Sequence, residues 1–443
     1  MRQLFGTDGI RGVADEFPLD KLTAFAVGVA LGRWVAGTHS NPEVVIGMDT
    51  RESGPWLAEH VAGGLDSVGV HTRFAGLITT PGIAYTARAP RFAAGVMISA
   101  SHNPYRDNGI KIVDHSGFKL PDDQEHNLEK DIFAWLESGD TARPKPLVVD
   151  KGLDCAYIDH LAAILPMGLG GMRIVVDAAN GSATHLAPTL FERLGATVDC
   201  IHCSPDVKNI NLNCGSQHLE SLRERVLATG ADIGVAFDGD ADRALFVSHT
   251  GKVVDGDAVL LLTALPLYAS GHLTEVVATV MSNLGLERAL KAHGIGLVRT
   301  SVGDKYVLEE MLRRKAPLGG EQSGHVIFSD YATTGDGMLT ALRVLAVMRA
   351  TRKDLDALTA EIETYPQRLV NVRVRERKPL DELPTVKAEV RRTETEFGDK
   401  GRVLVRFSGT EPLARVMVEG PQLDRVEFNA NAIAAAIRTE IGE

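Results

Sequence analysis

The sequence predicts an α/β protein with three repeated α/β domains of mixed, largely parallel sheets and a smaller C-terminal α+β domain. Short apolar runs rich in β-branched residues alternate with helix-length segments through the first 365 residues. This alternation is typical of βαβ units. After residue 366 the chain changes to short alternating strands and one final helical segment, which is typical of an α+β domain.

The expected elements can be placed in order. The apolar runs expected as strands begin at Val44, Ile174, Ile233 and Glu275, and helical stretches are expected at residues 57–68, 186–194 and 285–292. Further strands are expected at residues 369–375, 402–406 and 415–419, with a helix at residues 424–441. Because ligands of parallel sheets bind where strands end and loops begin, the loops after these strands are the candidate sites.

The same pattern suggests four domains. The three repeated domains are expected at residues 1–150, 151–252 and 253–365, with Arg143-Pro-Lys-Pro as a connector. The α+β domain is expected at residues 366–443. A chain of 443 residues is long enough for that number of domains.

The composition excludes several classes of protein. Hydrophobic residues make up 44% and charged residues 24% of the chain, which is ordinary for a soluble globular protein. The net charge of -11 argues against a nucleic-acid partner, although a local arginine cluster would still hold a small anion. The first residues have no apolar core of signal-peptide length, and Thr263 and Pro266 interrupt the longest apolar stretch. We therefore expect a soluble cytoplasmic protein without a membrane partner.

Four cysteines stand at positions 155, 200, 203 and 214. Cys200-Ile-His-Cys203 is formally a C-x-x-C motif, but a zinc site needs a second ligand pair and only Cys214 lies nearby. Four cysteines in so long a chain do not indicate a disulfide scaffold. We expect buried structural cysteines rather than metal or redox chemistry.

The most specific motif is Phe237-Asp238-Gly239-Asp240-Ala241-Asp242-Arg243, directly after an apolar run. Three carboxylates at alternate positions repel one another unless a cation lies among them, and hard oxygen ligands suit Mg²⁺ or Ca²⁺. The EF-hand alternative fails, because Arg243 and His249 occupy the positions that need glycine and glutamate. A solvated acidic turn is the other alternative. The strand-end placement favours a metal site with room for a phosphate oxygen.

A second motif is Arg406-Phe-Ser408-Gly409-Thr410-Glu411-Pro-Leu-Ala-Arg415. Guanidinium groups match phosphate bidentately, and consecutive backbone amides in a turn bind anions. The motif predicts a phosphate cradle, with a hairpin turn capped by hydroxyls as the alternative.

A third motif, Gly319-Gly320-Glu321-Gln322-Ser323-Gly324-His325, places three polar side chains at alternate positions. If the stretch is extended, Glu321, Ser323 and His325 share one face, which suits recognition of sugar hydroxyls. A lone histidine in such a loop is more often structural. Three polar side chains in step favour binding.

The N-terminal stretch Phe5-Gly-Thr-Asp-Gly-Ile-Arg11-Gly12 is glycine-rich but does not match G-x-G-x-x-G, and no apolar strand precedes it. A dinucleotide-binding fold is therefore unsupported. Arg11, among these glycines, would reach a ligand, and an ordered surface loop is the alternative.

The remaining motif is Ser99-Ala-Ser101-His102-Asn103-Pro104, after the apolar run 93–98. A hydrolase elbow needs G-x-S-x-G, but Ser99 and Asn103 occupy the glycine positions. A serine that carries phosphate would use the aspartate motif, because Mg²⁺ neutralises charge during phosphoryl transfer. Lys111 would serve as the base if cations such as Arg11 lowered its pKa. The alternative for Lys111 is a solvated surface lysine.

These motifs, in this order, resemble those of the α-D-phosphohexomutases. The Phe5 to Gly12 stretch, the Ser99-Ala-Ser101 doublet and the chain length resemble the bacterial phosphoglucosamine mutase branch in particular. The similarity covers the chain end to end, including Val302-Gly-Asp-Lys-Tyr-Val and Thr334-Gly-Asp-Gly.

The resemblance implies four domains around a central cleft and an enzyme that is phosphorylated on serine. Ser101 would carry the phosphoryl group and, with Asp238, Asp240 and Asp242, hold one Mg²⁺. Arg11, His102 and Lys111 would surround the transferred group. The sugar would contact Arg243, Glu321, Ser323 and His325, and the other phosphate would contact Arg406, Ser408, Gly409, Thr410 and Arg415.

The implied reaction converts glucosamine 6-phosphate to glucosamine 1-phosphate, a step that feeds UDP-N-acetylglucosamine synthesis. Glucosamine 1,6-bisphosphate would be the intermediate and activator, and a homodimer is a further expectation from the family. Two alternatives stay open: a mutase for glucose or mannose phosphates, and an inactive Mg²⁺-dependent sugar-phosphate-binding protein. Gln322 and the serine doublet favour the glucosamine reaction.

Overall fold

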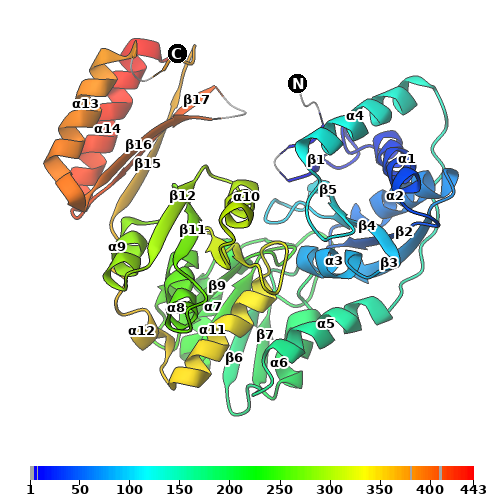
Figure 1. Ribbon diagram of the computed structural model, residues 1–443, viewed down its shortest axis with the longest axis horizontal. Helices are drawn as coiled ribbons and strands as arrows, with labels where there is room; N and C mark the ends of the chain where they lie inside the picture. The colour runs from blue at the N-terminus through cyan, green and yellow to red at the C-terminus, as the bar shows by residue number, and fades with distance from the viewer. Residues whose placement is uncertain (1–3, 7, 380–381, 409–411) are drawn as a thin grey trace. The chain divides into compact units, whose positions relative to one another are not determined.

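A computed structural model describes residues 4–6, 8–379, 382–408 and 412–443 (Figure 1). The chain divides into two compact units, Met1–Val280 with Val298–Thr359 and Met281–Leu297 with Ala360–Glu443. The described residues form four sheets, and the first three combine parallel and antiparallel strand pairs. The prediction of mixed α/β domains followed by an α+β domain is confirmed. Among the described residues, no helix has the length and apolar character needed to cross a membrane.

The first sheet belongs to the N-terminal α/β domain. Its elements are β1 (Ile10–Val13), α1 (Lys21–Thr38), β2 (Glu43–Met48), α2 (Gly54–Ser67), β3 (His71–Leu77), α3 (Thr80–Ala87), β4 (Phe92–Ile98), β5 (Asp107–Asp114) and α4 (Asp122–Glu137). The strand order is β1-β5-β4-β2-β3. β4 is buried along its whole length, because it lies between two neighbours and its sequence is apolar throughout. The loop after β4 therefore starts from a fixed point in the core.

The second sheet is built in the same way. Its elements are α5 (Gly152–Ile164), β6 (Arg173–Asp177), α6 (Leu186–Arg193), β7 (Thr197–Ile201), α7 (Glu220–Thr229), β8 (Ile233–Phe237), β9 (Ala244–Ser248) and β10 (Val253–Val254). The strand order is β10-β9-β8-β6-β7, and β6 is parallel to both β7 and β8. β8 ends at Phe237, so the aspartate motif follows the carboxyl end of a fully buried strand.

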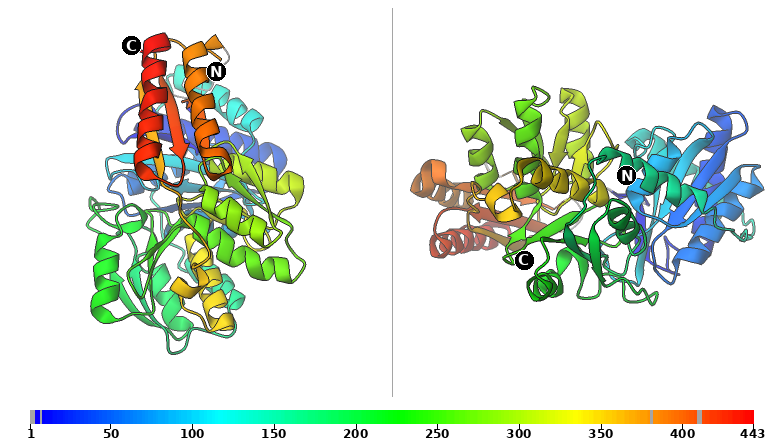
Figure 2. Two further views of the ribbon diagram at one scale, coloured as in Figure 1. Left: turned by 90° about the vertical axis from the view of Figure 1, so that its left-hand side faces the viewer. Right: turned by 90° about the horizontal axis from the view of Figure 1, so that it is seen from below.

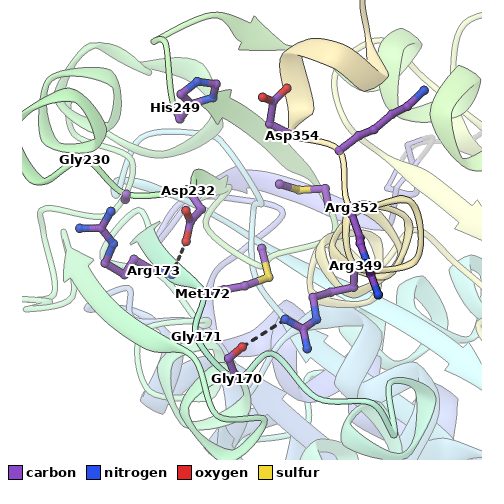
Figure 3. Close-up of a pocket in the computed structure, with 13 residues that line it drawn as sticks. Gly170, Gly171, Met172, Arg173, Gly230, Asp232, His249, Arg349, Arg352 and Asp354 are labelled. Atoms are coloured by element: carbon purple, nitrogen blue, oxygen red, sulfur yellow. Dashed lines mark hydrogen bonds between the residues drawn. The ribbon is translucent and has the colours of Figure 1, made fainter.

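The third sheet has the order β12-β11-β13-β14. Its strands and the helices along the same stretch are α8 (Gly256–Ala269), β11 (Glu275–Thr279), α9 (Leu284–Ala292), β12 (Gly296–Thr300), α10 (Asp304–Arg314), β13 (Leu318–Gly320), β14 (Val326–Phe328), α11 (Gly337–Thr351) and α12 (Leu355–Leu358). The side chain of Asp336 caps α11, and the Gly337 N–H donates to Ala241 O at 3.0 Å. One end of α11 thus meets the aspartate motif. The other end borders an open depression beside the start of β6 (Figure 3).

The C-terminal domain is an antiparallel sheet of order β15-β17-β16 with two helices. Its elements are β15 (Gln367–Arg373), α13 (Pro384–Phe397), β16 (Arg402–Phe407), β17 (Leu413–Glu419) and α14 (Leu423–Ile441). Figures 1 and 2 show α13 and α14 side by side against this sheet. Helix α13 was not among the expected elements, because it buries only Val386, Thr393 and Phe397 and leaves a weak apolar pattern.

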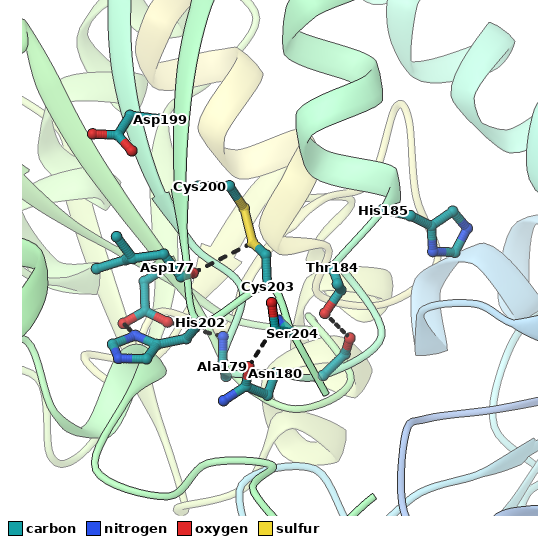
Figure 4. The surroundings of a disulfide bond; sticks show 12 residues. Asp177, Ala179, Asn180, Thr184, His185, Asp199, Cys200, His202, Cys203 and Ser204 are labelled. Atoms are coloured by element: carbon teal, nitrogen blue, oxygen red, sulfur yellow. Dashed lines mark hydrogen bonds and ion pairs between the residues drawn. A yellow bond between two sulfur atoms is a disulfide. The ribbon is translucent and has the colours of Figure 1, made fainter. Parts of the chain in front are cut away.

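The expectation of structural burial for the Cys200-Ile-His-Cys203 motif is wrong, whereas Cys214 is buried. Cys200, in β7, and Cys203, just after it, form a disulfide and are half-buried (Figure 4), and Cys155 is exposed. The chain turns at His202, which has a φ of 49°, and this turn brings the two sulfur atoms together. A local turn of this kind cannot be read from the strand-like run before it.

Candidate active site

Ser101 lies in the loop that joins the antiparallel strands β4 and β5. It is 1% exposed, and its φ of 53° is a left-handed conformation that is unfavourable for a residue with a Cβ. Its N–H donates to Ser99 Oγ at 3.0 Å, and its Oγ donates to Asp238 Oδ2 at 2.6 Å. The strained loop therefore presents the Ser101 hydroxyl to the aspartate motif.

A buried ion pair that no motif pointed to holds this loop. Arg51 Nε lies 2.9 Å from Asp49 Oδ2, both side chains are 0% exposed, and Ser99 Oγ donates to the same Asp49 oxygen at 2.6 Å. The other guanidinium N–H groups of Arg51 donate to four carbonyl oxygens of the loop, those of Ser101, Asn103, Pro104 and Asp107. Only a planar fork with five donors can serve so many acceptors. The available signal was Asp49-Thr-Arg51 at the end of an expected strand.

The aspartate motif forms a compact carboxylate cluster. Asp238, Asp240 and Asp242 are all buried, and each offers an oxygen within 4.8 Å of the others. Gly239 permits the approach of the serine loop, because a Cβ there would lie 2.4 Å from Ser101 O. The two loops can therefore meet only with glycine at this position.

The cluster fits a divalent cation. Asp240 Oδ1 and Asp242 Oδ1 are buried and have no hydrogen-bond partner within the described ranges. Burial, reinforced by the charges of Asp242 and Asp240, raises the pKa of Asp238 well above its usual range. Both observations indicate negative charge that a cation would neutralise, and an all-oxygen donor set suits Mg²⁺.

Lys111 lies on β5 and is 4% exposed. Its Nζ is 2.7 Å from Asp240 Oδ2 and 2.8 Å from Asp8 Oδ2. Burial and Arg11 would lower the pKa of Lys111, but the carboxylates of Asp240, Asp8 and Asp242 outweigh both and raise it. The condition for Lys111 to act as a base, a pKa lowered by neighbouring cations, is therefore not met, and the alternative of a solvated surface lysine is wrong.

Arg11 lies on β1, which pairs with β5. It forms an ion pair with Asp8, and its Nη1 lies 3.4 Å from Ala100 O next to the serine. Asp8 also lies 2.6 Å from Lys119 Nζ, and Lys119 pairs with Asp304 of the third α/β domain. The N-terminal stretch is therefore more than a surface loop. Asp8, Lys119 and Asp304 are charged neighbours of the site that the motifs did not single out.

His102 stands beside the serine hydroxyl, with Nδ1 3.3 Å from Ser101 Oγ. Burial, together with the charges of Arg243 and Arg11, lowers the pKa of His102 to about 4, so its ring is neutral at neutral pH. Arg243 follows the last aspartate, and its Nε is 3.8 Å from Asp242 Oδ1. His102 therefore lies beside the Ser101 hydroxyl, and Arg243 lies beside the carboxylate cluster.

The stretch from Glu321 to His325 is not extended. The prediction that Glu321, Ser323 and His325 share one face required an extended stretch, so that condition is not met. The stretch forms the hairpin turn between β13 and β14, in which Glu321 N–H donates to His325 O at 2.9 Å and Gly324 N–H donates to Glu321 O at 3.0 Å. Gly324 has a φ of 93°, and a Cβ there would lie 2.4 Å from Ala244 O. The turn reverses the chain, so alternate side chains no longer share a face.

The turn still brings Glu321 and Ser323 together. Ser323 Oγ lies 3.4 Å from Glu321 Oε2, and Gly303 N–H donates to Glu321 Oε1 at 3.2 Å. His325 is buried instead against the carboxylate cluster, with Nδ1 3.6 Å from Asp242 Oδ2. Burial lowers the pKa of His325, but the charge of Asp242 and the hydrogen bond to it outweigh burial and raise the pKa to about 9. Gly335 N–H approaches Nε2 at 3.1 Å, so the proton on Nδ1 faces Asp242. His325 therefore supports Asp242.

In the C-terminal domain, Arg406 on β16 stands directly opposite Arg415 on β17. Side chains of directly opposed residues lie on one face, where like charges repel. Burial and the charge of Arg415 lower the pKa of Arg406. Ser408 is buried, and its N–H donates to Leu413 O at 2.8 Å. Gly409 and Thr410 lie outside the described residues. An anion would relieve the repulsion between the two arginines.

Family comparisons agree with this arrangement. Four models of the phosphoglucomutase/phosphomannomutase family match in order: alpha/beta/alpha domain I at residues 2–138, domain II at 155–251, domain III at 255–365, and the C-terminal domain at 369–436. The chain therefore belongs to the phosphoglucomutase/phosphomannomutase family of phosphohexomutases, as its motifs predicted.

Individual proteins of the family are similar to this chain over its whole length. The chain is 60% identical to the phosphoglucosamine mutase of Solibacter usitatus over 100% of both chains. It is 48% identical to the phosphoglucosamine mutase of Koribacter versatilis, over 100% of this chain and 98% of that protein. Among solved structures, a phosphoglucomutase/phosphomannomutase family protein from Burkholderia thailandensis matches with a TM-score of 0.81 and 25% identity, covering 99% of each chain. The predicted enzyme class is confirmed, whereas the roles of single residues stay predictions.

Proposed function

We propose that this protein interconverts glucosamine 6-phosphate and glucosamine 1-phosphate through a phosphoserine at Ser101 and a glucosamine 1,6-bisphosphate intermediate. The observation that carries the proposal is the buried Ser101 hydroxyl, 2.6 Å from Asp238 within a cluster of three carboxylates. An acyl-transfer serine would gain nothing from such a cluster, because the carboxylates would repel the developing oxyanion. The 60% identical Solibacter usitatus protein, which bears the name phosphoglucosamine mutase, supports the choice of sugar.

Asp238, Asp240 and Asp242, with the phosphorylated Ser101, would hold one Mg²⁺. When bound, the ion neutralises charge on the phosphoryl group. The two partnerless carboxylate oxygens and the raised pKa of Asp238 support this assignment. Asp240 is in addition held by Lys111 and Thr80, and these contacts fix the carboxylate before any ligand arrives.

In the first transfer the P–O bond at Ser101 breaks and a P–O bond to a sugar hydroxyl forms. The proton of that hydroxyl ends on Ser101 Oγ, which restores the free serine. Lys111 and Arg11, on adjacent strands, would supply positive charge to the transferred oxygens, and the neutral His102 ring would hydrogen-bond at Ser101 Oγ. In the second transfer the other phosphate of the bisphosphate returns to Ser101 by the reverse chemistry.

The two remaining groups of residues would select the substrate. Glu321 and Ser323 meet in one turn, so they would bind adjacent sugar hydroxyls, with Arg243 and His325 bordering them. Arg406, Ser408 and Arg415, with Gly409 and Thr410, would hold the phosphate that is not being transferred. Since the bisphosphate must react at both ends, this cradle would accept the phosphate on either carbon.

The experiment is a substrate panel of glucosamine, glucose and mannose phosphates, assayed with Mg²⁺ and a catalytic amount of 1,6-bisphosphate. We expect the highest kcat/KM on glucosamine 6-phosphate. Faster turnover of a neutral hexose phosphate would replace the proposal with a phosphoglucomutase or phosphomannomutase. Binding without turnover on every sugar would indicate an inactive sugar-phosphate-binding protein. Full activity in the presence of EDTA would contradict the metal assignment.

We also propose the domain boundaries at residues 150, 252 and 365 and a homodimer. Limited proteolysis would test the boundaries by the positions of its cuts. Light scattering would test the dimer, and a mass equal to that of one chain would contradict it.

A further inference from the structure

An open depression of about 680 Å³ lies at the amino-terminal ends of β6 and β8 (Figure 3). Asp238 follows the carboxyl end of β8, whereas Ala231 and Asp232 of the depression precede its first residue. The two ends of a strand lie at opposite edges of a sheet. The depression is therefore separate from the candidate active site.

Four basic side chains line the depression: Arg173, Arg349, Arg352 and Lys353. None of the four forms an ion pair with a carboxylate anywhere in the described ranges. Arg349 and Arg352 come from the last turn and end of α11, and Arg173 begins β6. In a chain with a net charge of -11, this is a local excess of positive charge.

Two carboxylates, Asp232 and Asp354, also line the depression and offset part of this charge without forming an ion pair to the four cations within the described residues. Asp232 Oδ2 accepts from the Arg173 backbone N–H at 2.7 Å. Asp354 Oδ1 accepts from Ala357 N–H at 2.8 Å and so caps α12. Both carboxylates thus serve the backbone, and the guanidinium groups of Arg173 and Arg349 each use only one N–H on a carbonyl oxygen, those of Thr229 and Gly170, among the described residues.

The loop before β6 adds backbone donors. Neither the Gly170 nor the Gly171 N–H donates to another backbone group of the described residues, while Gly170 O accepts from Arg349 Nη1 at 3.1 Å. Figure 3 shows Arg349 turned toward this loop. Gly171 has a φ of 85°, a backbone conformation that favours glycine. At Gly170 an added Cβ would meet no atom within 4 Å, so space does not require glycine at that position. Within the described residues these two consecutive amides lie beside the Arg349 guanidinium group and have no backbone acceptor, so they can donate to an anion.

The depression also has an apolar part. Met172 and Met348 line it and are 8% and 7% exposed. Their thioether side chains are polarisable and adapt to irregular surfaces. An organic group attached to the anion would therefore find apolar contact beside the charged rim.

We propose that this depression binds a small molecule carrying a diphosphate group, with Arg349 and Arg352 as its main charged contacts. Guanidinium forks match phosphate oxygens bidentately. Two linked phosphates would engage the arginines of α11 together with the amides of Gly170 and Gly171. Met172 and Met348 would contact the organic part of the ligand. The site is independent of the proposed sugar specificity.

The test uses inorganic pyrophosphate as the probe and the full chain labelled with methyl-¹³C methionine, in EDTA so that no phosphoryl transfer occurs. Spectra of Met172→Leu and Met348→Leu assign the two methyl signals that report on the depression. We expect both signals to shift saturably with pyrophosphate, and less readily with inorganic phosphate. The double variant Arg349→Gln/Arg352→Gln should weaken the apparent affinity by about tenfold or more, because both forks are lost.

The matched control is Arg313→Gln/Arg314→Gln. It removes the same charge from the end of α10, where both arginines pair with Glu310. This control should bind pyrophosphate as the wild type does. Unshifted Met172 and Met348 signals, equal shifts with potassium chloride at matched ionic strength, or equal weakening by both double variants would overturn the proposal. If the Arg349 variant fails to fold, Arg352→Gln alone decides, since no ion pair of the Arg352 side chain is present within the described ranges.

Discussion

Replacing Ser99 with alanine tests the network that holds the serine loop. The Ser99 hydroxyl accepts from Ser101 N–H at 3.0 Å and donates to Asp49 Oδ2 at 2.6 Å. The substitution leaves the Ser101 amide unsatisfied at a position that is 1% exposed, which costs about 1–3 kcal/mol. The Asp49 carboxylate loses a charged hydrogen bond of similar size. Since one hydroxyl makes both bonds, we expect a total loss of about 2–4 kcal/mol.

The functional consequence follows from the backbone of Ser101. Its φ of 53° persists only while its surroundings hold it, and such strain stores about 1–3 kcal/mol. Without Ser99 the loop relaxes, and Ser101 Oγ moves away from Asp238. A displacement of about 1 Å at a reacting group can cost about 100-fold in rate. We expect a loss of that order in kcat with a much smaller change in KM, because the sugar-binding groups are untouched.

The assay combines steady-state kinetics on glucosamine 6-phosphate with amide hydrogen exchange of the serine loop. Exchange at Ser101 should accelerate in the variant. Ser138→Ala is the control, because it removes a hydroxyl bonded to Trp135 O at 2.7 Å in the same domain but far along the sequence from the loop. Wild-type kcat and unchanged exchange at Ser101 in Ser99→Ala would show that the Ser99 hydroxyl does not hold the serine loop.

Three other changes have defined outcomes. Gly239→Ala puts a Cβ 2.4 Å from Ser101 O, so turnover should fall at least about tenfold and stability should drop by about 1–3 kcal/mol. Wild-type kinetics in this variant would show that the two loops do not meet. Arg415→Gln relieves the opposed pair with Arg406, so thermal stability should hold while KM rises about tenfold; an unchanged KM would remove Arg415 from the phosphate cradle. Burial raises the pKa of Asp336 to about 6, so its contribution to stability is complete below about pH 4 and falls by about 3 kcal/mol as pH rises through about 6. Asp336→Asn keeps an oxygen that accepts from Leu339 N–H, and it should remove the pH-dependent loss of stability. If the unfolding midpoints of the variant and the wild type differ by the same amount at every pH, the raised pKa of Asp336 is contradicted.

Most of the fold could be predicted from the sequence, because buried strands and their polar ends leave a local pattern. β8 spans Ile233–Phe237 as expected, and α9 starts one residue before the expected helix. Helix α13 left no such pattern, since its few buried positions include the polar Thr393. Elements that pack through a wide apolar face can be predicted from the sequence, and elements that pack through a few atoms cannot.

The site was predictable where chemistry is local and was missed where partners are distant. The three aspartates need one another, so their spacing reveals them. Lys111 takes its charge environment from Asp8 on a separate stretch, and the sequence shows no sign of that contact. Arg51 acts through backbone carbonyls that any residue could supply. The turn at Gly324 depends on a close approach to Ala244, which an alternating pattern of polar side chains does not encode.

Ser101 is the group proposed to carry the phosphate. The most direct measurement is the intact mass of the protein after incubation with a 1,6-bisphosphate and Mg²⁺, followed by mixing with glucosamine 6-phosphate. We predict one added phosphoryl group on the wild type, located at Ser101 and transferred to the sugar in one turnover, with no addition and no mutase activity in Ser101→Ala. Mutase activity in Ser101→Ala, or turnover by an enzyme that never gains the phosphoryl mass, would contradict the central claim.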